Sequence, residues 1–193
     1  MKKSRLEAFS DGVLAILITI LVLDLHAPHS SAPAALLPLW PVALSYLMSF
    51  VYIGIYWNNH HHLWHAVEHV TGGVLWANLH LLFWLSLLPF ATAWMGEHPL
   101  EPAPEALYGL VLLGAAVAYY VMTRVLLAAH ARDSMLARAL GSDVKGRASL
   151  AIYAAAIVLA LGFGLALPAH LLYWVVALVW LVPDRRFERL ARG

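Results

Sequence analysis

The chain of 193 residues contains no cysteine, and only 12% of its residues are charged. The absence of cysteine excludes disulfides, thiolate metal ligands and a cysteine nucleophile. Soluble domains are about one quarter charged, whereas 62% of this chain is hydrophobic and its mean hydropathy is +0.75. Strand-type alternation is lacking, and long runs of Leu, Ala and Val take its place. The composition therefore predicts an all-α membrane protein.

Six apolar segments are long enough, or nearly so, to cross a bilayer, which takes about 20 residues. Prolines punctuate the first and third connections, and Pro168 predicts a tight break between the last two spans. We expect one membrane domain over residues 1–193, ending in a basic tail at residues 183–193. The predicted spans are residues 9–26, 39–59, 74–95, 105–130, 148–167 and 170–182.

Lysine and arginine are missing from the connections after the first, third and fifth spans. They gather before the first span, between the fourth and fifth, and after the sixth. Because basic loops favour the cytoplasmic side of a membrane, both termini are predicted to be cytoplasmic in a multi-pass protein of the cell membrane. Glu97, Glu101 and Glu105 are expected to make the outward third connection acidic.

The first span has two polar features that point in different directions. At 100° per residue, one helical face carries Ile16, Thr19, Ile20 and Leu23. Asp24 flanks that face near the outer end, whereas Asp11 projects about 140° away from Ile16. We therefore expect Asp11 to point into its own subunit, and the Ile16 face to meet a partner or an axis. Ordinary helix packing produces similar apolar stripes, so periodicity alone does not decide between these readings.

The sequence of the first span also resembles a known motif, and this resemblance favours one of the two readings. Residues 5–11 read Arg5-x-x-x-Phe9-Ser10-Asp11, and residues 12–24 read Gly-Val-x-Ala-Ile-x-Ile-Thr-x-Leu-Val-Leu-Asp. This pattern closely resembles the signature of the transmembrane protein 175 family of potassium channels, which lack the usual selectivity-filter sequence. The resemblance covers the first span in detail and the six-span layout in outline. It implies a homotetramer of six-helix subunits, of the prokaryotic type, whose first helix lines a central pore.

The resemblance also implies roles for single residues. Ile16 corresponds to the narrowest hydrophobic layer, Ile20 and Leu23 to further apolar layers, and Thr19 to a contribution to cation preference. Asp24 is expected near the outer mouth. A dry constriction penalises the more strongly hydrated Na⁺, so we expect a cation channel with modest K⁺ over Na⁺ selectivity. Its expected partners are K⁺ and other monovalent cations, the lipid bilayer and further copies of itself, with no cofactor and no nucleic acid.

The motif residues Arg5, Phe9, Ser10 and Asp11 are expected to hold the first helix in register, because an unpaired carboxylate inside a membrane is costly. Arg5 is one candidate ion-pair partner of Asp11. The remaining expected partners lie at the end of the second span, residues 57–65, with one more in the third span. They are Trp57, Asn58, His61, His65 and His80.

Two other functions remain as alternatives. The run His65-Ala-Val-Glu68-His69 matches the H-x-x-E-H pattern of inverted zinc peptidases. So short a pattern matches easily in a chain with 11 histidines, so we predict no enzyme and no metal centre, and leave open a pH-sensitive or adventitious metal site. The second alternative is a secondary ion transporter, which would normally show inverted repeats and broken helices.

Overall fold

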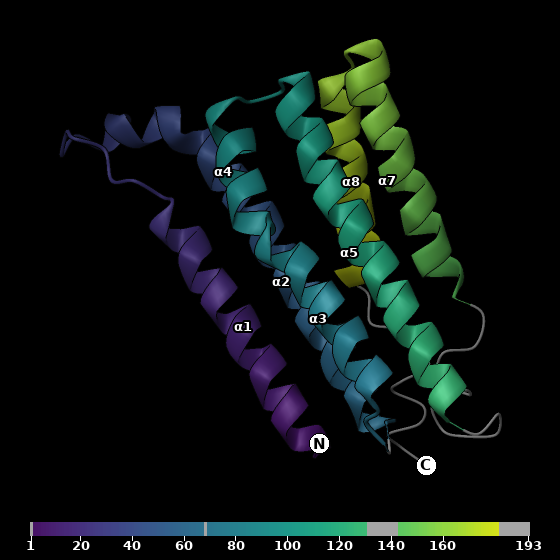
Figure 1. Cartoon of the computed structure of the whole chain (residues 1–193). Coiled ribbons are helices and arrows are strands. Elements are labelled where there is room, and N and C mark those ends of the chain that lie inside the picture. Colours follow the sequence, from purple (N-terminus) through teal and green to yellow (C-terminus); the bar gives the residue numbers. More distant parts are fainter. Residues whose placement is uncertain (1, 68, 131–142, 182–193) are drawn as a thin grey trace.

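The computed structural model describes residues 2–67, 69–130 and 143–181, and all regular structure within these ranges is helical. The long helices lie alongside one another as a bundle (Figure 1). Their order is α1 (Lys3–Leu23), η1 (Pro33–Leu39), α2 (Trp40–His65), α3 (Gly72–Ser86), α4 (Leu88–Glu97), α5 (Pro102–Ala129), α7 (Val144–Phe163) and α8 (Ala166–Leu181).

Five helical segments in the described ranges are long and apolar enough to cross a membrane. They are α1, η1 with α2, α3 with α4, α5, and α7, while α8 is a shorter apolar helix of 16 residues. The prediction of an all-α membrane fold is therefore confirmed. Helix α2 continues to His65, so the histidines at the end of the second span stand on a helix.

The third span is kinked at Leu87, between α3 and α4. Pro89 causes the kink, because proline has no N–H to donate to the preceding turn. Leu87 keeps right-handed helical angles (φ −85°, ψ −11°), and Ala91 N donates to its carbonyl at 3.1 Å. The interruption is thus a proline kink within one continuous span rather than an unwound segment.

The break between α7 and α8 falls at Gly164, not at Pro168 as the sequence predicted. Gly164 has φ +67°, a conformation that glycine adopts without steric cost. Gly164 N donates to Ala160 O at 3.0 Å, and Leu165 N donates to Leu159 O at 2.9 Å. This pair of bonds closes the end of a helix before a glycine. Pro168 lies in the first turn of α8, where a missing N–H costs nothing.

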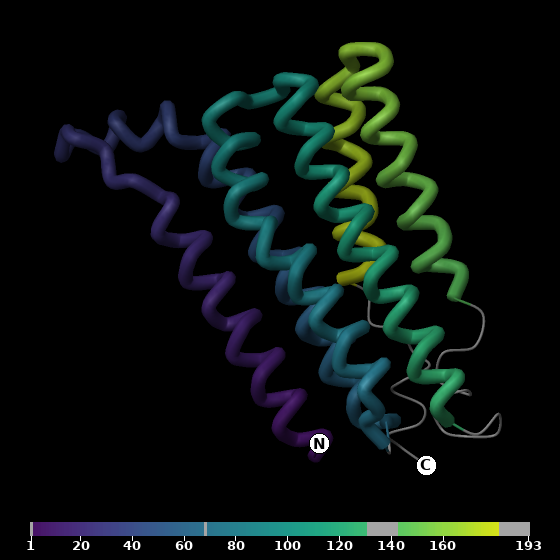
Figure 2. The backbone as a smooth tube through the Cα atoms, in the orientation of Figure 1, coloured from purple at the N-terminus to yellow at the C-terminus, as the bar shows by residue number. Residues whose placement is uncertain are grey.

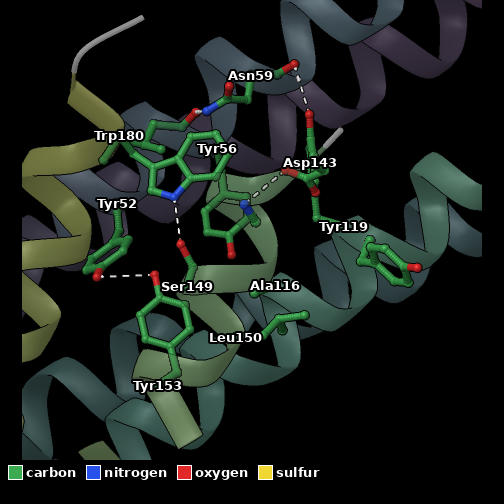
Figure 3. A pocket seen from close by; sticks show the side chains of 13 residues that line it. Tyr52, Tyr56, Asn59, Ala116, Tyr119, Asp143, Ser149, Leu150, Tyr153 and Trp180 are labelled. Carbon is green, nitrogen blue, oxygen red and sulfur yellow. Dashed lines mark hydrogen bonds between the residues drawn. The ribbon is translucent and has the colours of Figure 1, made fainter. Parts of the chain in front are cut away.

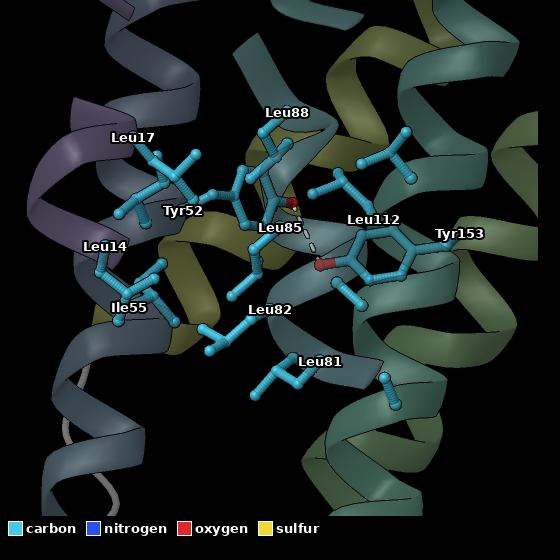
Figure 4. Close-up of a cluster of buried hydrophobic side chains, with 14 of the residues drawn as sticks. Leu14, Leu17, Tyr52, Ile55, Leu81, Leu82, Leu85, Leu88, Leu112 and Tyr153 are labelled. Atoms are coloured by element: carbon cyan, nitrogen blue, oxygen red, sulfur yellow. Dashed lines mark hydrogen bonds between the residues drawn. The ribbon is translucent and has the colours of Figure 1, made fainter. Parts of the chain in front are cut away.

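The core of the bundle is built from leucines and tyrosines of α1, α2, α3, α5 and α7 (Figure 4). Helix α5 packs against α3 and α7, and the close fit depends on its glycines. A Cβ at Gly114 would overlap the Trp84 indole. Tyr52 donates to the main-chain oxygen of Tyr173 at 2.7 Å and receives a bond from Tyr153 at 3.3 Å.

Helix α1 stands at the edge of the bundle and packs mainly on α2, with smaller contacts to α3 and α4 (Figure 2). The start of α1, the end of α5 and the start of α7 lie at one end of the molecule (Figure 1). The described basic side chains belong to these segments: Lys2, Lys3, Arg5, Arg124, Lys145 and Arg147. We call this the basic end.

Candidate functional site

Helix α1 has a packed face and an exposed face. Leu6, Ser10, Leu14, Leu17 and Leu21 repeat every three or four residues and are all buried. In Figure 4, Leu14 and Leu17 extend from α1 toward the leucines of α3. This face therefore fastens α1 to its own subunit, as expected for an amphipathic repeat of period 3.6.

The opposite face of α1 exposes a row of large apolar residues. The exposed fractions of Ile16, Ile20 and Leu23 are 57%, 39% and 75%. Thr19 is also exposed, and its hydroxyl donates to Ile16 O at 2.7 Å. We call these four residues the exposed stripe. Phe9, two turns before Ile16, is 52% exposed on the same side of the helix.

Three polar side chains of α1, spaced four residues apart, face α2. Lys3 Nζ donates to the main-chain oxygen of Val67 at 3.1 Å. Glu7 Oε1 lies 3.5 Å from His61 Nδ1, and Trp57 Nε1 donates to Asp11 Oδ1 at 3.2 Å. Because α1 and α2 are antiparallel, positions that ascend along α1 meet positions that descend along α2. These three contacts form a polar seam between the two helices.

A second polar connection is fully buried and runs from α1 through α3 to α2. Asn78 Nδ2 donates to Ser10 Oγ at 2.9 Å, and Asn78 Oδ1 lies 2.8 Å from His60 Nε2. Trp64 Nε1 donates to the same His60 nitrogen at 2.7 Å. A neutral imidazole nitrogen cannot accept from the indole and donate to the amide oxygen at once. His60 Nε2 can therefore accept from Trp64 Nε1 or donate to Asn78 Oδ1, but it cannot do both at once.

The predicted motif residues are divided between the two faces. Ser10 is buried, and Asp11 is half-buried against Trp57. Arg5 is exposed and makes no ion pair with Asp11, so the candidate pairing of these two residues is absent. Phe9 joins the exposed side of α1 rather than the packed side expected for a residue that holds the helix in register.

Of the partners expected for Asp11 at the end of α2 and on α3, some lie beside α1 and others do not. His61 belongs to the polar seam, and His65 lies one turn further along α2, with its Nε2 3.0 Å from His61 Nε2. His80 is exposed and accepts from Trp84 of its own helix at 3.1 Å. Asn58 is half-buried, and no hydrogen bond joins it to α1 within the described ranges. The buried hub is Asn78, two residues before His80.

Comparison with known proteins bears on this arrangement directly. The family model of the endosomal/lysosomal potassium channel TMEM175 matches residues 5–89, which include α1 from Arg5 onward and the seam contacts of Glu7 and Asp11. A potassium channel of Chryseobacterium sp. (strain P1-3) is 49% identical over 98% of this chain and 97% of its own length. The chain belongs to the TMEM175 family. The resemblance predicted from the first span is therefore confirmed, and with it the expectation that the protein is not an enzyme, since this is a family of channels.

Two further relatives place the chain within the family. The crystal structure of a lysosomal potassium-selective channel TMEM175 homolog from Chamaesiphon minutus is 28% identical, with a TM-score of 0.78. It matches 93% of this chain over 96% of its own length. The human endosomal/lysosomal proton channel TMEM175 is 32% identical over 54% of this chain, but only 23% of the human protein is covered. Like its bacterial relatives in the TMEM175 family, the chain is a multi-pass membrane protein.

Asp24 and Glu97 border a hollow at the end of this TMEM175 family member opposite the basic end. Asp24 caps α1 and is half-buried. The hollow has a volume of about 690 Å³, lies between the α1–η1 connection, α2 and α4, and is lined in part by His26 and Trp40. Both of its carboxylates are placed where they can raise the local cation concentration.

Glu105 does not contribute to an acidic surface, contrary to the prediction from the sequence. Its exposed fraction is 0%, and its Oε1 accepts from His170 Nδ1 at 3.0 Å. Trp174 Nε1 donates to His170 Nε2 at 3.2 Å, and the Tyr173 hydroxyl donates to the main-chain oxygen of Glu105 at 2.9 Å. The carboxylate thus joins α5 to α8 inside this TMEM175 fold instead of facing the outside.

The histidines at the basic end form no catalytic zinc centre in the described ranges, where no group of three or more His, Cys, Asp or Glu side chains surrounds a common point. The predicted pattern also needs Glu68, which lies outside those ranges. His69 N contacts His130 Nε2 at 3.4 Å, and the two rings stack 6.4 Å apart. These two histidines therefore connect the segment after α2 with the end of α5.

A cavity between α2, α5, α7 and α8 is lined largely by aromatic rings (Figure 3). Its volume is about 50 Å³. Trp180 Nε1 donates to Ser149 Oγ at 2.9 Å across one side, and Asp143 Oδ1 accepts from Gly146 N at 2.9 Å. None of the predicted site residues line this cavity. It lies on the far side of α2 from the exposed stripe, so we assign it no part in the function proposed for this TMEM175 subunit.

Proposed function

We propose that this protein is a K⁺-permeable cation channel in which four copies place α1 around a central pore. The exposed stripe of α1 carries the proposal, because Ile16 and Leu23 are more than half exposed on a helix whose other face is tightly packed. Large apolar patches exposed on an isolated subunit mark places where something else packs or passes. The family and its bacterial relatives named as potassium channels favour the pore over a purely structural contact.

The narrowest point of the proposed pore is the ring of Ile16 side chains, followed outward by Ile20 and Leu23. Such a ring is too dry for a fully hydrated ion, so ions pass only when it widens or when they shed water. Na⁺ holds its water more tightly than K⁺, and shedding water therefore costs Na⁺ more. This difference produces a modest preference for K⁺ without a filter of backbone carbonyls.

Thr19 is suited to contribute to that preference. Its hydroxyl proton is already donated to Ile16 O at 2.7 Å. A hydroxyl oxygen that donates its proton within its own helix still keeps acceptor lone pairs. Four such oxygens, one turn beyond the Ile16 ring, would replace some of the water oxygens that a partly dehydrated cation has lost.

The proposed orientation places the basic end of the bundle in the cytoplasm of a cell whose plasma membrane the protein spans. The described basic side chains all belong to segments at this end, as the positive-inside rule requires. Asp24 and Glu97 then lie at the outer mouth, around the hollow of about 690 Å³. Their charge would attract cations toward the pore at low ionic strength.

Planar-bilayer recording of the purified protein tests the channel and its selectivity. Under bi-ionic K⁺/Na⁺ conditions, the wild type should show a reversal potential displaced modestly toward that of K⁺. Ile16→Asn should raise the current and move the reversal potential toward zero, because a polar ring wets more readily. The matched control is Val158→Asn, a β-branched residue of α7 that is 56% exposed, almost the same fraction as Ile16.

Two results would contradict the proposal. A well-folded wild type without cation current would exclude a channel, and equal effects of Ile16→Asn and Val158→Asn would exclude α1 as the lining helix. Single-channel steps also separate a channel from the transporter alternative by throughput. The kinked third span gives that alternative no support, since Leu87 keeps helical angles.

A further inference from the structure

Two imidazoles at the basic end present the same ring nitrogen to each other. His61 and His65 stand one turn apart on α2, and their Nε2 atoms are 3.0 Å apart. Two nitrogens bound to one tetrahedral Zn²⁺, at Zn–N distances of about 2.0–2.1 Å, are separated by about 3.3 Å. The separation of the two nitrogens therefore differs by only about 0.3 Å from that of two ligands of one metal ion.

The orientation of His61 is fixed from two sides. Glu7 Oε1 lies 3.5 Å from its Nδ1, the nitrogen that faces away from His65. Trp57 stacks on the ring, with centroids 5.9 Å apart and planes inclined by 21°. A carboxylate beside Nδ1 favours the tautomer that carries its proton there, which leaves the Nε2 lone pair free to bind. Carboxylate–histidine pairs of this kind orient many metal-binding histidines in proteins.

We propose that His61 and His65 form a site for a borderline divalent metal ion, Zn²⁺, with Glu7 as the positioning residue for His61. Imidazole nitrogen suits Zn²⁺, whereas Mg²⁺ and Ca²⁺ require oxygen ligands. The two histidines supply two of four positions, and water fills the others, because the described ranges hold no third ligand at this point. His65 is exposed, so the ion reaches the site from solvent.

Binding at this site would strengthen the polar seam. In the metal-free pair, His65 Nε2–H donates to His61 Nε2; in the bound pair, His65 carries its proton on Nδ1 and both Nε2 atoms bind the ion. His61 is then held between the metal on one side and Glu7 of α1 on the other. Since Glu7 is spaced four residues from both Lys3 and Asp11, the bound ion would act on the row of contacts that fastens α1 to α2.

Calorimetric titration of ZnCl₂ into the purified full-length protein tests the proposal. We expect saturable binding of one ion per subunit and none of MgCl₂ at the same concentrations. His65→Ala should lower the affinity for Zn²⁺ at least tenfold. In the described ranges the hydrogen-bond and ring partner of this exposed side chain is His61 of its own helix, so the fold should survive. Glu7→Gln should lower the affinity about tenfold, the usual effect of removing an orienting partner of a ligand.

Two matched controls each remove a different histidine. His98→Ala changes the opposite end of the molecule, where the ring bonds only to the carbonyl of Trp94 in its own helix. His69→Ala changes a nearby histidine outside the pair. Both should bind Zn²⁺ as the wild type does. Unchanged affinity in His65→Ala, no binding by the wild type, or equal losses in the controls would overturn the site and show adventitious metal binding only. Unchanged affinity in Glu7→Gln would overturn the role of Glu7.

Discussion

Replacing His170 by leucine should destabilise the protein, because it removes the hydrogen-bond partner of a buried carboxyl group. Glu105 is fully buried and His170 is 9% exposed, so water does not replace the lost bond. Glu105 Oε2 already has no hydrogen-bond partner in the described part of the chain, which leaves the 3.0 Å bond from His170 as the only one to either carboxylate oxygen there.

The size of the expected destabilisation follows from this lack of other hydrogen bonds to the carboxyl group of Glu105 in the described ranges. The bond joins an imidazole whose Nε2 accepts from Trp174 to a buried carboxyl group, and leaving such a group without its donor costs about 3 kcal/mol. For a chain of this size, each kcal/mol lowers the unfolding midpoint by about 2–4 °C, which gives a fall of about 6–12 °C for His170→Leu. The double variant Glu105→Leu/His170→Leu removes both polar groups. Since well-packed apolar residues often replace such pairs without loss, it should unfold at a higher temperature than His170→Leu alone.

Thermal unfolding of the detergent-purified variants, followed by the loss of the monodisperse peak in size-exclusion chromatography, measures these differences. His98→Leu is the matched control, since His98 is exposed and its ring bonds to the main-chain oxygen of Trp94 one turn earlier. Its midpoint should stay close to that of the wild type. A double variant less stable than His170→Leu would refute the reasoning, because it would mean that Glu105 contributes as much without His170 as with it.

Three smaller effects follow from other contacts. Ser10→Ala removes the acceptor of a buried amide donor of α3 and should cost about 1–3 kcal/mol in thermal unfolding, whereas the exposed Ser4→Ala should cost nothing measurable. Gly114→Ala places a methyl group on the Trp84 indole, and the same assay should show a loss of about 1–3 kcal/mol. Asp11→Asn keeps an acceptor at a half-buried position, so tetramers and K⁺ currents should persist with a stability loss below about 1 kcal/mol.

The helical wheel predicted the packed and exposed faces of α1, because the direction of each side chain on a regular helix follows from its position in the sequence. Ile16 and Leu23 fall on the exposed face, and Asp11 is turned toward α2, as the angles of 100° per residue require. Length and composition likewise account for the five helical segments of the described ranges that are long and apolar enough to cross a membrane. The kink at Leu87 was harder to place, because a proline inside an apolar run can end a helix or merely bend it.

The polar partners were not predictable, because they join residues far apart in the chain. Asn78 meets Ser10 across 68 positions, and His170 meets Glu105 across 65. An acidic residue beside prolines normally indicates an exposed connection, and only the packing of α8 on α5 buries Glu105. The spacing of Lys3, Glu7 and Asp11 was a usable signal, since polar residues at i and i+4 share a helical face.

The signature motif itself is divided by the geometry of α1. On the helical wheel, Ser10 and Asp11 lie about 120–140° from Ile16, whereas Arg5 and Phe9 lie within about 20° of it. The exposure of Phe9, at 52%, agrees with that angle. Whatever surrounds the exposed stripe in the proposed tetramer therefore also surrounds Phe9 and, one turn before it, Arg5. Ser10 and Asp11 therefore attach α1 to the rest of the bundle, whereas Arg5 and Phe9 extend the exposed stripe to the basic end.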